Sequence, residues 1–445
     1  YNSIKSYRGE SMNNLVNFKV KNFRSFYDET IFSMQATPNK EFAELNTFLC
    51  NEKLFPKNEN ELLKTAIIFG ANASGKTNLV KALYFMKALV LTSSNPLNPV
   101  VQSNTPFAFF DDADKEPTLF EIEIIANDIF YDYGFEITNR QFTKEFLKKR
   151  ANGRLVDIFE RNVIGVDLSG SSQKKKGTIG SINTQSLFLS FANTPFLALD
   201  EDIVCDLRNV LNWFNEPNLF IIDEYTMNKY NIYQEEDGKY AKLALEFIKQ
   251  ADIGVENFTV VQEKVGDKTD PFIRVNGKHP PQFLPIDKDL IGLDLKTEFN
   301  IFNKSHEIVG RKDVYLEKDF GFHSDGTYRL LSILGLILKV LDKGGILIID
   351  EVDSKLNFLI VDYILKSFNS INKNINNAQF ISTAHNVLLM DDGLRRDQIY
   401  FTSKNKYGAT ELYSLVDFND VRKTDLFSKK YLAGFYSAIP TIKGV

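Results

Sequence analysis

The sequence predicts an α/β fold in which both ends of the chain contribute to one largely parallel sheet. An apolar run at 65–69 is typical of a buried strand, and apolar residues at helical spacing follow Thr77. Farther along, two more strand-like runs at 346–349 and 379–383 each follow a helical pattern. Strands that alternate with helices form parallel sheets with right-handed crossovers, so we expect these runs to share a sheet.

Changes of pattern divide the chain into four parts. Residues 1–11 precede Met12 and resemble a cloning remnant or an upstream extension. Residues 12–118 indicate a strand, a loop, a strand and a long helix, which would form the first half of a head domain. Residues 119–309 mix strand and helix patterns and are expected to form an inserted α+β lobe. Residues 310–445 return to strand–helix alternation and would complete the head.

The middle part contains a clear hairpin signal. Residues alternate between apolar and polar over 119–125 and 129–137, and a short turn-like segment joins the two runs. Further strands are expected over 258–302. The expected helices outside the first part lie at 200–214, 240–251, 325–341 and 358–368.

Bulk composition limits the classes of function. The chain has 53 Lys and Arg against 58 Asp and Glu, a formal net charge of −5, so binding of nucleic acid is possible but unsupported by charge. Basic runs at 148–150 and 174–176 are typical of solvated loops, and a phosphate-backbone contact is the alternative. Two cysteines indicate neither a disulfide framework nor a zinc site. No apolar run has the roughly 18–20 residues of a membrane span, and we expect a cytoplasmic protein.

The segment 70–77, which follows the strand-like run at 65–69 and leads into the predicted helix, matches the pattern G-x-x-x-x-G-K-S/T in full. Its glycines let backbone N–H groups face phosphates, and the helix N-terminus adds a positive end. Lys76 is expected to reach the β- and γ-phosphates of ATP, and the Thr77 hydroxyl to ligate Mg²⁺. A glycine-rich turn that merely has this sequence is the alternative. The expected nucleotide-binding residues are Gly70, Ala71, Asn72, Ala73, Ser74, Gly75, Lys76, Thr77 and Asn78.

Two later strands deliver polar groups at their ends. Asp350 and Glu351 follow the run at 346–349, where Asp350 would hold Mg²⁺ and Glu351 would polarise the attacking water. An acidic strand-to-loop junction is the alternative. His385 follows the run at 379–383 and would hydrogen-bond the γ-phosphate or the attacking water, although a lone histidine is more often structural.

Ser324 is placed as the N-cap of the predicted helix that starts at 325, and capping alone would account for it. The order G-x-x-x-x-G-K-T, S-D-G-T, D-E and T-x-H resembles the ABC-type ATPase heads of the SMC, RecF and OLD group. This resemblance implies an ABC-type P-loop NTPase head. It also implies that Ser324 and Gly326 bind the γ-phosphate held by a second subunit.

Four segments resemble more closely the RloA-like "AAA family" ATP-binding proteins, namely 22–26, 324–327, 394–398 and 431–440. Members of that group occur in bacterial anti-phage and abortive-infection systems, often beside a separate effector gene. The resemblance implies an ATP-hydrolysing homodimer of heads, or a higher oligomer, that serves as sensor or scaffold for an effector. It also places Arg24 near the nucleotide.

This chain departs from the group's pattern at two places. His323 stands where an acidic residue usually precedes the signature serine, and Asn357 and Phe358 stand where His-Pro usually follows a leucine. Gln102 is a weak candidate for the Q-loop glutamine. The 60 residues after His385 are few for a TOPRIM nuclease domain, so any nuclease activity is expected on a partner chain. A RecF-like DNA-repair ATPase and a non-catalytic nucleotide-gated scaffold are the competing interpretations.

Overall fold

The computed structural model forms two compact units. The first comprises Tyr1–Ile221, Lys343–Glu351 and Leu365–Val445, and the second comprises Ile222–Asp342 and Val352–Ile364. The basic run at 174–176 and most of the segment 1–11 lie outside the described residues. The structure describes residues 11–56, 59–95, 100–168, 177–179, 183–194, 199–222, 230–251, 254–264, 272–275, 282–285, 291–319, 321–421 and 425–439.

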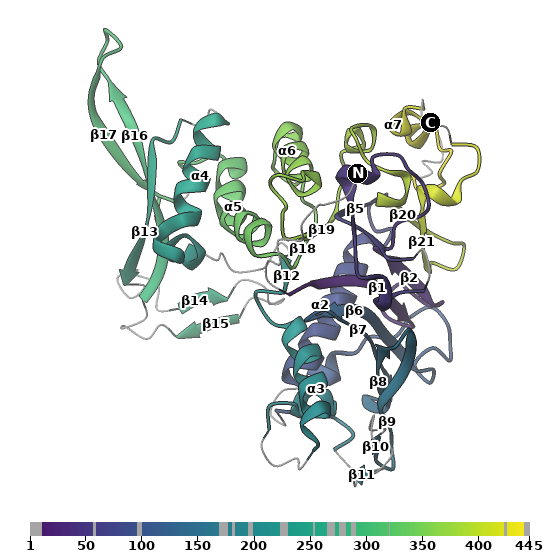
Figure 1. Ribbon diagram of the computed structural model, residues 1–445. Helices are drawn as coiled ribbons and strands as arrows, with labels where there is room; N and C mark the ends of the chain where they lie inside the picture. The colour runs from purple at the N-terminus through teal and green to yellow at the C-terminus, as the bar shows by residue number, and fades with distance from the viewer. Residues whose placement is uncertain are drawn as a thin grey trace. The chain divides into compact units, whose positions relative to one another are not determined.

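A six-stranded sheet with strand order β12-β18-β19-β5-β20-β21 carries the segments that the sequence analysis singled out. Strands β18, β19, β5 and β20 run parallel, and β21 is antiparallel to β20. In Figure 1 the early strand β5 lies beside β19 and β20 from the other end of the chain. The predicted α/β class, with both ends of the chain in one sheet, is therefore confirmed. The strands are β5 (Thr65–Gly70), β12 (Leu219–Ile222), β18 (Ile346–Ile349), β19 (Gln379–Thr383), β20 (Ile399–Lys404) and β21 (Thr410–Ser414).

An eight-stranded antiparallel sheet of order β11-β10-β9-β8-β7-β6-β1-β2 forms the rest of the first unit's strand framework. The predicted hairpin is confirmed, and its turn residues Asn127 and Asp128 have φ of 53° and 63°, as a tight type I′ turn requires. Because β1 pairs with β6, this sheet runs across the predicted boundary at residue 118. The strands are β1 (Asn13–Lys21), β2 (Thr30–Ser33), β6 (Thr118–Ala126), β7 (Ile129–Thr138), β8 (Gln141–Ala151), β9 (Arg154–Asn162), β10 (Val166–Leu168) and β11 (Gly177–Ile179).

Helix α2 (Lys76–Thr92) is the central helix of the first unit. Its apolar side chains belong to one buried cluster with residues of both large sheets, including Phe120 and Ile346. A helix with apolar residues on most sides is expected to be buried, which anchors the turn at its start. Other helices and strands of the first unit are α1 (Ala43–Asn46), α3 (Glu201–Phe214), α7 (Phe427–Leu432), β3 (Thr47–Leu49) and β4 (Glu61–Leu63).

The second unit combines helices with antiparallel strands. Its three-stranded sheet has the order β13-β16-β17, and β14 pairs with β15. The four predicted helices are confirmed and correspond to α3 of the first unit and to α4, α5 and α6. None of the helices in the described part of the chain is long and apolar enough to cross a membrane. The elements are α4 (Lys239–Gln250), β13 (Asn257–Lys264), β14 (Phe272–Val275), β15 (Gln282–Pro285), β16 (Ile291–Phe302), β17 (Ile308–Tyr315), α5 (Asp325–Lys343) and α6 (Phe358–Asn369), the last shared with the first unit.

Candidate functional site

The loop between β5 and α2 is a tight turn that excludes larger residues at its end. Gly75 has φ of 119°, in the left-handed region that favours glycine. A Cβ atom on Gly75 would lie 2.3 Å from the Thr410 Oγ1 atom of β21. The second glycine of the motif is therefore required by the close approach of β21, as well as by the turn itself.

Hydroxyl groups from distant segments hold the middle of this loop. Ser74 Oγ lies 2.6 Å from Thr402 Oγ1, and Thr410 Oγ1 lies 2.8 Å from Ser74 O. Thr410 Oγ1 also lies 2.8 Å from Ser25 Oγ, which accepts a hydrogen bond from Asn78 Nδ2 at 2.7 Å. The sequence analysis missed Ser25, Thr402 and Thr410. Only Ser25 carried a signal, since it belongs to the segment 22–26 that marks the resemblance.

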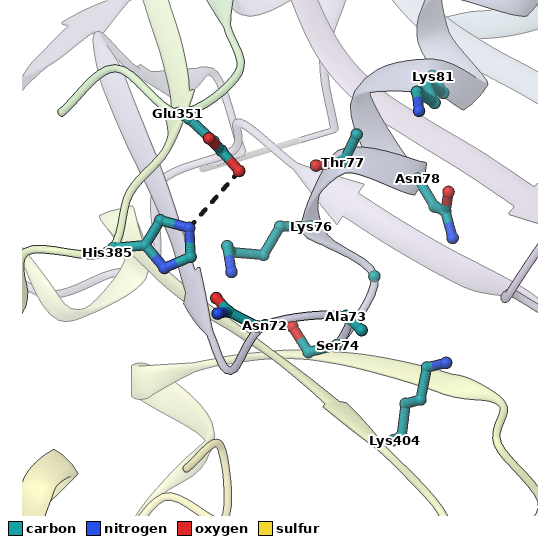
Figure 2. A pocket seen from close by; sticks show the side chains of 11 residues that line it. Asn72, Ala73, Ser74, Lys76, Thr77, Asn78, Lys81, Glu351, His385 and Lys404 are labelled. Carbon is teal, nitrogen blue, oxygen red and sulfur yellow. Dashed lines mark ion pairs between the residues drawn. The ribbon is translucent and has the colours of Figure 1, made fainter. Parts of the chain in front are cut away.

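A cavity of about 720 Å³ opens beside the loop (Figure 2). Its lining contains three lysines and one carboxylate, so it suits a polyanionic ligand such as a triphosphate. Glu351 and His385 therefore line the same cavity as the loop residues. Lys81 and Lys404 were not predicted, because Lys81 lies one turn beyond the motif and the pairing of β20 was not foreseen. The lining residues are Asn72, Ala73, Ser74, Gly75, Lys76, Thr77, Asn78, Lys81, Glu351, His385 and Lys404.

Lys76 lies against the backbone of the loop. Its Nζ atom donates hydrogen bonds to Gly70 O at 2.8 Å and to Ala71 O at 3.2 Å. The residue is only 5% exposed, so these bonds offset much of the cost of burying an ammonium group. Figure 2 shows the side chain on the side of the loop that faces His385.

The end of β18 brings Asp350 and Glu351 to the edge of the sheet where the loop begins, and β19 ends beside them. Strand β19 lies between β18 and β5, and all three are parallel, so their carboxyl ends share one edge. The Thr383 hydroxyl donates to Asp350 Oδ1 at 2.6 Å and accepts the Glu351 N–H at 2.7 Å. Thr383 is fully buried, so it fixes both acidic residues from the neighbouring strand.

Glu351 has an unusual backbone for its residue type. Its φ of 51° places it in the left-handed region, which costs about 1–2 kcal/mol for a residue with a Cβ atom. Such strain occurs preferentially at functional sites. The side chain is 49% exposed, and its Oε1 atom lies 3.6 Å from Nε2 of His385 (Figure 2). The strained backbone therefore directs a solvent-accessible carboxylate toward an imidazole.

Two oxygen groups at this edge fit Mg²⁺, which prefers carboxylate, hydroxyl, phosphate and water ligands. The Thr77 side chain lines the cavity, and Asp350 is buried at 8% exposure. Within the described residues, no group of three or more His, Cys, Asp or Glu could hold a metal ion. A site with few protein ligands is typical of Mg²⁺ that is shared with a bound phosphate chain.

Arg24 and Gln102 do not line the cavity. Arg24 has φ of 52° and directly precedes Ser25, which contacts Asn78 of the loop helix. Gln102 accepts a hydrogen bond from Arg140 at 3.5 Å. Arg24 is thus one residue from the loop network, whereas nothing in the described lining connects Gln102 with the cavity.

The signature segment lies in the second unit. Ser324 caps α5, as predicted, because its Oγ atom accepts the Thr327 N–H at 3.1 Å. A Cβ atom on Gly326 would lie 2.6 Å from the Lys355 carbonyl oxygen, so the close approach of that backbone requires glycine. Ser324 itself is exposed. The helix N-terminus is therefore available to an anion.

His323 stands where the resemblance leads one to expect an acidic residue, and the structure gives it a partner. Its Nε2 atom lies 3.0 Å from Thr297 Oγ1 of β16, and its ring lies 5.6 Å from that of Phe299. Burial lowers the pKa of His323, which favours the neutral ring. The histidine thus attaches the signature segment to the three-stranded sheet.

A family model described as "AAA domain, putative AbiEii toxin, Type IV TA system" matches residues 66–391, which is more than half of the chain. The matched range includes the loop, the signature segment, both acidic residues and His385. A comparison with curated proteins found no match.

Several solved structures of SMC heads are similar to this chain. The head domain from Thermotoga maritima is 13% identical, with 90% of this chain and 98% of that chain covered and a TM-score of 0.38. A head with a coiled coil and joint from Pyrococcus yayanosii is 11% identical, with coverage of 95% and 100% and a TM-score of 0.41. A head from Pyrococcus furiosus, bound to the C-terminal domain of ScpA, is 12% identical, with coverage of 91% and 96% and a TM-score of 0.39. The fold described above rests on the sheet topology itself.

Proposed function

Since this chain belongs to the family of AAA domains described as a putative AbiEii toxin of a type IV TA system, we propose that it binds and hydrolyses ATP with Mg²⁺. One observation carries the proposal: Lys76, Glu351 and His385 line a single basic cavity with the phosphate-loop backbone. Phosphoryl transfer to water requires a held phosphate chain, charge neutralisation and an oriented nucleophile. The cavity contains a residue suited to each of these tasks.

The roles follow from the chemistry of each group. The loop N–H groups and Lys76 bind the β- and γ-phosphates, while Thr77 and Asp350 hold the metal ion. Mg²⁺, when bound, neutralises charge on the phosphate oxygens. Glu351 accepts a proton from the attacking water, and its contact with His385 keeps the carboxylate beside an imidazole that hydrogen-bonds the γ-phosphate or the water.

We propose further that two heads form a homodimer around the nucleotide. In this arrangement Ser324 and Gly326 of the second copy bind the γ-phosphate, and Arg24 lies near the nucleotide. The exposed N-terminus of α5 supports this proposal, because a helix of 19 residues begins there and directs its positive dipole end toward Ser324. Asp325, the first residue of α5, partly opposes the binding of an anion there, because its carboxylate is negative, although it forms an ion pair with Lys355.

The biological role that we propose is that of an ATP-driven sensor or scaffold in an RloA-like anti-phage or abortive-infection system with a separate effector. The family description, which names a toxin–antitoxin system, supports this role. The segments 22–26 and 431–440, which resemble the RloA-like group, support it too.

A RecF- or SMC-like DNA-repair ATPase is the alternative. The basic run at 148–150, which could contact a DNA backbone, makes contacts within the first unit. Lys149 Nζ lies 2.6 Å from Asp206 Oδ2, and the Arg150 guanidinium lies 4.9 Å from the centre of the Phe130 ring. The ion pair of Lys149 reduces the positive potential that a DNA backbone would need, and the net charge of −5 points the same way.

The test measures ATP turnover and oligomeric state together, for wild type and for Glu351→Gln, with and without duplex DNA. Removing the base while keeping its shape is expected to lower kcat about 100-fold or more and to accumulate an ATP-bound dimer. Glu44→Gln, at an exposed site on α1, is the matched control and should behave as wild type.

Unchanged turnover in Glu351→Gln would show that the catalytic assignment is wrong. Strong stimulation of wild type by DNA would favour the repair function over the defence function. Turnover that DNA leaves unchanged, together with a protein that co-purifies from the native host, would favour the sensor or scaffold role.

A further inference from the structure

The segment after α7 returns to the phosphate loop. It turns at Gly434, with φ of 84°, and at Ser437, with φ of 55°. The Ala438 carbonyl oxygen then accepts the N–H of Ala71 at 3.0 Å. Ala71 is the first residue after β5, so the segment contacts the loop at its entry.

This contact involves a peptide group that also binds the motif lysine. The N–H of the peptide between Gly70 and Ala71 is bound by Ala438, and the carbonyl oxygen of the same peptide accepts from Lys76 Nζ at 2.8 Å. A rotation of this peptide plane would break both bonds together. The Ala438 carbonyl therefore fixes the orientation of the carbonyl that holds Lys76.

Two tyrosines fix the Ala438 segment in turn. The Tyr431 hydroxyl donates to Ala438 O at 3.0 Å, and the Tyr413 hydroxyl donates to Tyr436 O at 2.6 Å. The rings of Tyr431 and Tyr436 stack on Phe401 of β20, with centroids 5.7 Å and 5.0 Å away. Burial raises the pKa of Tyr431 to about 12, so its hydroxyl keeps its proton and acts as a donor at neutral pH.

We propose that Tyr431 is a positioning residue of the nucleotide site, which acts through Ala438 and Ala71 to set the affinity of the loop for a nucleoside triphosphate. This inference rests on the proposed ATP-binding function. The hydroxyl of Tyr431 binds Ala438 O and its ring stacks on Phe401, so we expect its effect to fall on the binding of the phosphate chain and to leave the chemical step unchanged.

The matched pair Tyr431→Phe and Tyr436→Phe tests the proposal. Both substitutions remove one hydroxyl and keep a ring that stacks on Phe401. The Tyr436 hydroxyl is buried without a hydrogen-bond partner in the described structure, which makes it the control. We expect the Kd and KM for ATP to rise about fivefold in Tyr431→Phe, the size of one ordinary hydrogen bond. We expect kcat at saturating ATP to stay within twofold, and the control to match wild type.

Hydrogen exchange at the Ala71 amide gives a readout that needs no nucleotide. The exchange rate should increase about fivefold in Tyr431→Phe and stay at the wild-type value in Tyr436→Phe.

Equal KM values and equal exchange rates in the two variants would overturn the proposal, as would a fall in kcat with KM unchanged. If wild type fails to bind ATP while the exchange rates differ as expected, the proposed function is wrong and the structural link stands. Tyr413→Phe, which releases Tyr436 O, is the second variant and should show the same direction if Tyr431→Phe fails to fold.

Discussion

Replacing Thr383 by valine removes one hydroxyl and leaves the side chain nearly the same size. That hydroxyl donates to Asp350 Oδ1 at 2.6 Å and accepts the Glu351 N–H at 2.7 Å. Asp350 is only 8% exposed, so water cannot readily replace the lost donor. The substitution therefore weakens the two acidic positions of the site without touching either residue.

The expected loss of stability comes from two hydrogen bonds. Leaving the buried Asp350 carboxylate without this donor costs about 2 kcal/mol, and losing the acceptor of the Glu351 N–H costs about 1 kcal/mol. The free energy of unfolding should therefore fall by about 3 kcal/mol. The left-handed backbone of Glu351 loses the bond that holds it, and a displacement of about 1 Å in a catalytic group lowers rates by about 100-fold. We expect kcat to fall at least tenfold.

Urea unfolding followed by tryptophan fluorescence measures the first quantity. Trp213 is the sole tryptophan, is fully buried and belongs to the first unit, so its emission reports on the unit that contains the cavity. Ser382→Ala is the control, because the Ser382 hydroxyl is buried on the same strand without a hydrogen-bond partner in the described structure. Thr383→Ser keeps the hydroxyl and should recover most of both losses. If Thr383→Val matches Ser382→Ala in stability and turnover, the argument from the bridging hydroxyl is refuted.

Three further predictions follow from the same unit. Gly75→Ala should abolish ATP binding, measured by calorimetry, because its Cβ atom would lie 2.3 Å from Thr410 Oγ1; wild-type affinity would contradict this. Lys404→Ala should raise the KM for ATP about fivefold at low salt and less at 0.5 M salt, since screening weakens the attraction to phosphate; a salt-independent effect would argue against a charge role. Burial raises the pKa of Asp132 from 3.8 to about 7, so its cost in stability grows as pH rises from about 4 to 7 and is constant above 7. Asp132→Asn should therefore stabilise the protein more at pH 8 than at pH 4, by at most about 4 kcal/mol, and equal effects in urea unfolding at both pH values would contradict the assignment.

The site residues that the sequence predicts were found from local sequence patterns. Asp350 and His385 closely follow strand-like runs, and Lys76 belongs to a glycine-rich motif between such a run and a helical pattern. Such placement is visible without knowledge of strand pairing. The groups that hold them could not be found in this way. Thr383 acts as a bridge only because β19 lies between β18 and β5, and Thr402 reaches the loop only because β20 pairs with β5. Strand order depends on contacts between distant segments, which a single sequence does not reveal.

The hairpin over β6 and β7 shows the same division between local and distant information. Its alternating pattern and turn predicted the element correctly, since both depend on neighbouring residues. The partner on its other side is β1, more than 90 residues earlier, and nothing in the local pattern indicates that pairing.

The contact between Thr410 and the phosphate loop also bears on how the protein is made. Ser74 is separated from Thr410 by 336 residues, so a ribosome adding about 5–20 residues per second completes the loop well before its support exists. During that interval α2 can form, but both strands that pair with β5, namely β19 and β20, have not been synthesised, and neither have Thr402 and Thr410. Under the proposed function, we therefore expect nucleotide affinity to be acquired late in synthesis, and a nascent or shortened chain that ends before β20 to bind ATP more weakly than the finished protein.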